Sequence, residues 1–176
     1  EPHKFGHILG YEKLTPLHGE WIKRGFYWRN LKALQAHRGS YKTTALIIVG
    51  SIWYLLFINP HDTIGTFRKA DEEAQKIGKT VKEHFESPEV LAIARHIYGS
   101  KVRTLKTSNW SNSSIKLSIS QNKSPEGNFE ARGTQGSITG SHYNVVLPDD
   151  IITLKDRISK AERERTIDII RELQTN

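Results

Sequence analysis

Cysteine and methionine are absent from the 176 residues, and no apolar run is long enough to cross a membrane. Without cysteine, the chain can form neither disulfides nor thiolate metal sites. The most apolar run is ALIIVGSIWYLLFI (45–58), which is typical of a buried core helix and too short for a bilayer span. Because the sequence begins at Glu1 and has no methionine, we expect it to be a trimmed piece of a longer chain.

Blocks of like charge are also absent, because the Lys and Arg side chains are scattered along the chain. The net charge of +7 and the pI of about 9.6 favour polyanionic partners without identifying one. The 36% apolar and 26% charged fractions are those of an ordinary globular protein. No repeat or linker interrupts the chain, so we expect a lead-in over residues 1–30 packed on one domain over residues 31–176.

Local patterns predict alternating strands and helices, and hence an α/β fold. Residues 1–30 show no clear period and predict irregular structure with one short helix. Residues 30–36 alternate weakly and predict a short strand, and residues 43–57 are apolar nearly all round, which predicts a buried helix. A second strand is expected over 62–69 and a helix over 69–85.

The second half of the chain continues this alternation. Ser87 and Pro88 predict the start of a helix that ends at Gly99. The segment SIKLSIS (114–120) predicts a half-buried strand, paired as a hairpin with residues 128–132. The run NVVLPDDIIT (144–153) predicts a further strand closed by two acids. A capping box, Ser159 with Glu162, predicts the last helix.

The segment HRGSYKTT (37–44) resembles part of a phosphate-binding loop. Such loops read G-x-x-x-x-G-K-[ST]; their backbone amides surround the phosphates, the Lys reaches them, and the hydroxyl binds Mg²⁺. Lys42, Thr43 and Thr44 match this pattern, but Tyr41 stands where the second glycine belongs and Gly39 is the only glycine. A loop followed by a long helix suits a phosphate, since helix N-termini offer unpaired N–H groups. Taken alone, a basic turn before a core helix explains the segment equally well.

Two carboxylates at the end of the run VVLPDD (145–150) change this balance. In α/β sheets, ligands bind at the carboxyl ends of the strands. Asp149 would then face a Mg²⁺ held by Thr43, and Asp150 would lie near the attacking water. The loop and the acids together favour a nucleoside triphosphatase over coincidence.

At these motifs the chain resembles the large subunit of the terminase, the ATPase that packages DNA into tailed-phage capsids. The resemblance runs through HRGSYKTT, through EARGTQGSITGSHYNVVLPDDIIT and into DRISKAERERTIDIIREL, and so covers most of residues 31–174. It implies a P-loop NTPase fold of the ASCE type, a mostly parallel sheet flanked by helices, with an antiparallel hairpin before the Walker B strand. By resemblance, Asp149 is the Walker B acid that holds Mg²⁺ with Thr43, and Asp150 is the catalytic carboxylate. The implied ATP-binding Walker A residues are Arg38, Gly39, Ser40, Tyr41, Lys42, Thr43 and Thr44, of which Arg38 and Lys42 also stabilise charge.

The resemblance further implies ATP and Mg²⁺ as cofactors and the translocation of double-stranded DNA into a capsid as the function. The implied partners are DNA, the portal protein, the small terminase subunit and further copies in a ring, in the host cytoplasm and at the procapsid portal, with no membrane. The chain ends before the coupling motif and nuclease domain of that family, so we expect a monomer in isolation. A helicase-type ATPase, or a non-catalytic basic DNA-binding module with a degenerate loop, remains an alternative.

Other candidate residues carry weaker signals. Arg132 could be an arginine finger that acts on a neighbouring subunit, although a salt-bridged surface role is more common for such a residue. The segment GTQGSITG (133–140) could bind phosphate through its amides. Trp21, Tyr27 and Trp28 could stack on adenine, but packing is the commoner fate of such rings. The eight His residues show no metal-site spacing.

Overall fold

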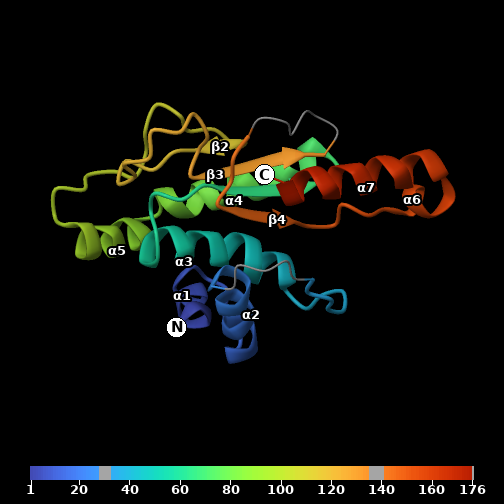
Figure 1. The fold of residues 1–176 in the computed structure, drawn as a ribbon. Helices are drawn as coiled ribbons and strands as arrows, with labels where there is room; N and C mark the ends of the chain where they lie inside the picture. Colours follow the sequence, from blue (N-terminus) through green and yellow to red (C-terminus); the bar gives the residue numbers. More distant parts are fainter. Residues whose placement is uncertain (28–32, 135–140, 176) are drawn as a thin grey trace.

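A four-stranded sheet lies at the centre of the computed structural model, which describes residues 1–27, 33–134 and 141–175 (Figure 1). The elements among these residues are, in chain order, α1 (Pro2–Ile8), α2 (Pro16–Tyr27), the π-helix η1 (Thr44–Val49), α3 (Gly50–Phe57), β1 (Ile64–Arg68), α4 (Asp71–Glu86), α5 (Pro88–Tyr98), β2 (Ser114–Ile115), β3 (Phe129–Gly133), β4 (Val145–Pro148), α6 (Leu154–Ile158) and α7 (Lys160–Thr175).

The strand order is β2-β3-β1-β4. β1 runs parallel to both β3 and β4, while β2 pairs antiparallel with β3. The predicted α/β class with a mostly parallel sheet is therefore confirmed. The expected antiparallel pair also precedes β4 in the chain. Because β1, β3 and β4 are parallel, their carboxyl ends meet at one edge of the sheet.

The two faces of the sheet enter different hydrophobic cores, since side chains alternate along each strand. One face packs against η1, α3 and α4 through residues such as Ile64 and Phe129. On the other face, Phe67 and Tyr143 pack with Leu173 of α7. In Figure 1, α1 and α2 lie on the side of α3 that faces away from the sheet. Their buried residues Phe5 and Ile22 belong to the first core.

Elements with strong local signals form as predicted. β1 and β4 fall within the ranges expected for them, and α4 ends one residue beyond its expected range. The Ser87 hydroxyl accepts a hydrogen bond from Val90 N (3.3 Å) at the start of α5, and Gly99 follows its end with φ of 101°. Ser159 Oγ accepts one from Glu162 N (3.4 Å) at the start of α7. The predicted buried helix is present too, although residues 44–49 of it are π-helical.

The lead-in prediction was wrong, because residues 1–27 form two helices instead of one. Pro2 and Pro16 each begin a helix, where a missing N–H costs nothing. Gly6 and Gly19 lie inside these helices and allow close packing: a Cβ on Gly6 would be 2.4 Å from Leu14 Cδ1. Tertiary packing therefore outweighs the poor helix propensity of glycine.

Two predicted strands also differ. Residues 33–36 carry no strand, and the rest of the segment predicted over 30–36 lies outside the described residues. The strand predicted over 114–120 ends after Ile115, because the next backbone donors turn elsewhere. Leu117 N donates to Asn128 Oδ1 (2.9 Å) and Ser118 N donates to Leu105 O (2.9 Å).

Within the part of the chain that the structure describes, no helix is both long and apolar enough to span a bilayer.

Candidate phosphate and metal site

The loop before η1 reaches its helix through two left-handed residues. Gly39 has φ of 83° and Tyr41 has φ of 56°, after which the helical conformation begins at Lys42. Ala45 N donates the first helical hydrogen bond to Tyr41 O (2.8 Å). Tyr41 thus adopts a backbone conformation that L-residues rarely take, at the position where phosphate-binding loops have glycine.

A buried histidine of α2, His18, holds this loop in place through a hydrogen bond. His18 Nδ1 accepts a hydrogen bond from Thr15 N (3.0 Å), so the proton lies on Nε2. His18 Nε2 then donates to Ser40 O at 3.0 Å. The sequence motifs gave this histidine no role. Pro16 is typical of a helix start just before His18, but nothing in the sequence linked that helix to Ser40.

The two acids lie opposite the helix start, at the end of β4. Thr43 Oγ1 donates to Asp149 Oδ2 at 2.8 Å, across 106 positions of sequence. Lys42 Nζ lies 3.3 Å from Asp150 Oδ1. Asp149 is buried and Asp150 is exposed, with φ of 50° at Asp150. The structure therefore brings together the four residues that the sequence motifs singled out.

Arg68 joins this group, although sequence analysis did not select it. β1 and β4 are parallel with Phe67 opposite Pro148, so the next residues lie side by side: Arg68 at the end of β1 and Asp149 just after β4. Arg68 Nη2 lies 2.8 Å from Asp149 Oδ2 and 3.1 Å from Asp150 Oδ2. A basic residue at the end of a predicted strand was the signal, but the neighbouring strand was not known.

A cleft of about 640 Å³ opens between the loop and Asp150. Its lining residues are Ala36, His37, Arg38, Gly39, Ser40, Tyr41, Lys42, Thr43, Thr44 and Asp150. All seven residues predicted to bind ATP are among them. Ser40 Oγ is buried and has no hydrogen-bond partner among the described residues. A hydroxyl donor left in this way, beside Lys42 and a helix start, suits an anionic oxygen such as that of a phosphate.

The oxygen atoms of Thr43 and Asp149 are of the type that Mg²⁺ prefers. Among the described residues, no group of three or more His, Asp or Glu side chains is arranged to hold a metal by itself. In nucleotide sites, Mg²⁺ is held by one or two protein oxygens together with phosphate oxygens and water, and Thr43 with Asp149 can supply two. The residues present thus fit Mg²⁺ with a polyphosphate.

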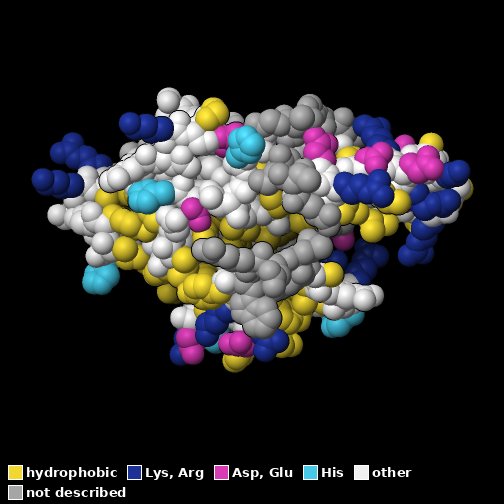
Figure 2. Space-filling view, in the orientation of Figure 1, with side chains coloured by type: hydrophobic (Ala, Val, Ile, Leu, Met, Phe, Trp, Pro, Cys, Tyr) yellow, Lys and Arg dark blue, Asp and Glu magenta, His cyan; other side chains and the backbone are white. Residues whose placement is uncertain are grey.

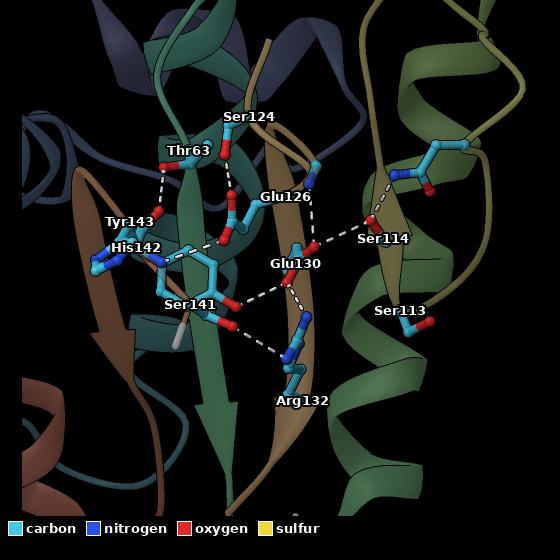
Figure 3. A network of polar contacts seen from close by, with 12 residues as sticks. Thr63, Ser113, Ser114, Ser124, Glu126, Glu130, Arg132, Ser141, His142 and Tyr143 are labelled. Atoms are coloured by element: carbon cyan, nitrogen blue, oxygen red, sulfur yellow. Dashed lines mark hydrogen bonds and ion pairs between the residues drawn. The ribbon is translucent and has the colours of Figure 1, made fainter. Parts of the chain in front are cut away.

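Arg132 is held within the chain by polar contacts (Figure 3). It projects from β3, where Nη2 is 2.6 Å from Glu130 Oε2 and Nη1 donates to Ser141 Oγ (3.3 Å). Glu130 Oε2 also accepts from Tyr143 OH (2.7 Å), and burial together with this bond raises the pKa of Tyr143 well above its ordinary value. Arg132 does not line the cleft. The structure therefore shows the salt-bridged arrangement that sequence analysis considered the more common one.

Trp21 and Tyr27 do not line the cleft. Trp21 makes an edge contact with His18 at 4.9 Å between ring centroids, and Tyr27 makes one with Trp53 at 5.9 Å. Trp28 and residues 135–140 of the glycine-spaced segment lie outside the described residues.

Comparison with known proteins adds no family. No protein-family model matches the chain, and a search of curated proteins finds no match.

Proposed function

We propose that the chain binds a nucleoside triphosphate with Mg²⁺ and hydrolyses it, as the ATPase domain of a terminase large subunit. The contact between Thr43 Oγ1 and Asp149 Oδ2 carries the catalytic part of this proposal. This contact joins two features: the start of a helix that follows a loop with a Lys-Thr pair, and the acids at the end of a strand. P-loop enzymes use this combination for phosphoryl transfer.

Each residue would have a distinct task. The amides at the helix start and Lys42 would hold the phosphates, and Thr43 and Asp149 would hold Mg²⁺. Bound Mg²⁺ supplies neutralisation of the charge on the β and γ phosphates. Asp150 would orient the attacking water and accept its proton, while the bond from the γ phosphorus to the bridging oxygen breaks, giving nucleoside diphosphate and inorganic phosphate. Arg38 lines the same cleft and would add positive charge at the phosphates.

The packaging of double-stranded DNA is proposed on the resemblance of the motifs alone. The same holds for the portal protein, the small subunit, the ring of copies, the trans role of Arg132 and the host cytoplasm. In Figure 2, Lys and Arg side chains gather near α5 and around α6 and α7, where acids lie among them. This face carries no single basic stripe, so the charges on it indicate no particular DNA path.

Binding of a non-hydrolysable ATP analogue, measured by calorimetry with and without Mg²⁺, tests the catalytic part. Lys42→Ala should abolish binding, whereas Lys79→Ala, on an exposed part of α4, should leave it unchanged. Saturable, Mg²⁺-dependent heat supports the ATPase. The absence of binding heat in the wild type would overturn the proposed ATPase and favour the non-catalytic DNA-binding module.

The two acids should differ in a second measurement. Asp149→Asn should weaken the Mg²⁺-dependent binding of the analogue, because it removes a metal-binding charge. Asp150→Asn should preserve binding and lower single-turnover hydrolysis by roughly 10²-fold, the size expected for a lost general base. Equal losses of binding in both variants would mean that the acids form one metal site, and normal hydrolysis by Asp150→Asn would contradict the role given to Asp150.

A further inference from the structure

The guanidinium of Arg68 bridges three carboxylates at the carboxyl edge of the sheet. Nη2 contacts Asp149 Oδ2 (2.8 Å) and Asp150 Oδ2 (3.1 Å), while Nη1 lies 3.5 Å from Glu73 Oε2 on the first turn of α4. The Arg68 side chain is 17% exposed, so these contacts are only partly screened by water.

Asp149 Oδ2 contacts both the proposed metal-binding residue Thr43 and Arg68. It already accepts hydrogen bonds from Thr43 Oγ1 and from Arg68 Nη2, both at 2.8 Å. A carboxylate oxygen has about two acceptor sites. A metal bound between Thr43 Oγ1 and Asp149 Oδ2 would need one of them, and a divalent cation beside a guanidinium on the same oxygen would be repelled by it.

We propose that Arg68 competes with the metal for the acid pair, and that Glu73 receives the guanidinium when the metal binds. This inference rests on the proposed function, because it assigns Mg²⁺ to Thr43 and Asp149. The transfer would also affect Asp150. When Arg68 turns to Glu73, its guanidinium leaves Asp150 Oδ2, and that oxygen becomes free to contact water.

Two features separate this arrangement from a purely structural ion pair. Arg68 Nε is buried and has no hydrogen-bond partner among the described residues, so the present contacts leave the guanidinium incompletely satisfied. The contact with Glu73 is long and Glu73 is half exposed, so this contact has room to shorten. Arg68 thus has a second partner within reach, on a different element from the acids.

The test is the Mg²⁺ concentration at the midpoint of two titrations of the purified chain. One follows thermal unfolding with MgCl₂ alone, and the other follows binding of a fixed concentration of the non-hydrolysable ATP analogue. Arg68→Gln should lower both midpoints by about tenfold, as expected when a charged hydrogen bond no longer competes. Glu73→Gln should raise them by up to about fivefold, since it removes a partially exposed receiving charge. Lys79→Gln removes one positive charge from an exposed site on α4 and should leave the midpoints unchanged.

The opposite directions of the two variants make the outcomes distinct. An unchanged or raised midpoint in Arg68→Gln overturns the inference, and a raised one would place Arg68 among the phosphate-binding residues. If Arg68→Gln is poorly folded, the shift in Glu73→Gln decides, and its absence overturns the inference. If the wild type binds no nucleotide, the proposed function fails, and the titration with MgCl₂ alone still decides. No response to MgCl₂ in any variant overturns the inference as well.

Discussion

Replacing Tyr41 tests whether the loop requires a glycine or only a backbone with positive φ. Tyr41 has φ of 56° and a side chain that is 39% exposed. An L-residue in the left-handed conformation loses roughly 1–2 kcal/mol relative to its ordinary conformations, and glycine does not. Glycine loses about 0.5–1 kcal/mol more backbone entropy than alanine when the chain folds. Tyr41→Gly should therefore be more stable than Tyr41→Ala by about 0.5–1 kcal/mol.

The comparison of Gly with Ala isolates the backbone, because both variants lose the same aromatic ring. Gly39 offers the reverse test, since its φ is 83° and a Cβ there would meet no atom within 4 Å. Gly39→Ala should then lose about 1 kcal/mol for conformational reasons alone.

Urea unfolding of the three variants, extrapolated to water with a shared slope, gives these differences. A Tyr41→Ala protein as stable as Tyr41→Gly would refute the reasoning, because the left-handed conformation would then carry no cost. Binding of the ATP analogue completes the experiment. Tyr41→Gly should bind it like the wild type, and a loss of binding would give the ring a role that its backbone does not explain.

Three further predictions concern residues that do not line the cleft. Arg132→Gln should lower the free energy of unfolding by about 1.5 kcal/mol through Glu130 and leave analogue binding unchanged; weakened binding would contradict a structural role. Hydrogen bonds from Thr153 and Thr166 hold the pKa of Asp156 far below its ordinary value. Ionised Asp156 therefore stabilises the fold fully above about pH 4, and this stabilisation is lost as pH falls further. The difference in Tm between wild type and Asp156→Asn should shrink below that pH. Burial lowers the pKa of His84, so its protonation should reduce Tm as pH falls below about 6.5, and His84→Gln should remove that slope.

The elements that sequence analysis predicted correctly are those whose boundaries are set by their own residues. Ser87 caps α5 with its own hydroxyl, and Gly99 ends that helix with a conformation that suits glycine. β4 is a continuous apolar run, and α4 has an apolar stripe with a helical period. Such signals act within a few residues, so they can be read without knowledge of the fold.

The residues that sequence analysis missed act across the fold. His18 contacts Ser40 from a helix whose position was not predicted, and Arg68 contacts Asp149 because β1 and β4 are neighbours in the sheet. Strand order and helix docking depend on the whole set of apolar faces, and a single sequence does not reveal them. The loop and the acids were found because each carries a motif, whereas Arg68 and His18 carry none.

Backbone conformation adds an argument about the cleft that is independent of the motifs. Among the described residues, Tyr41 and Asp150 are the two non-glycine residues with positive φ, at 56° and 50°. Both line the same cleft, although 109 positions separate them in sequence. Left-handed residues other than glycine persist where the surrounding structure holds them, and they cluster at active sites and ligand-binding sites. Tyr41 directs the chain into the helix that presents Lys42 and Thr43, and Asp150 turns the chain away from β4 directly after Asp149. The two strained residues therefore lie where the proposed mechanism needs the chain to change direction sharply, once before the phosphates and once beside the attacking water.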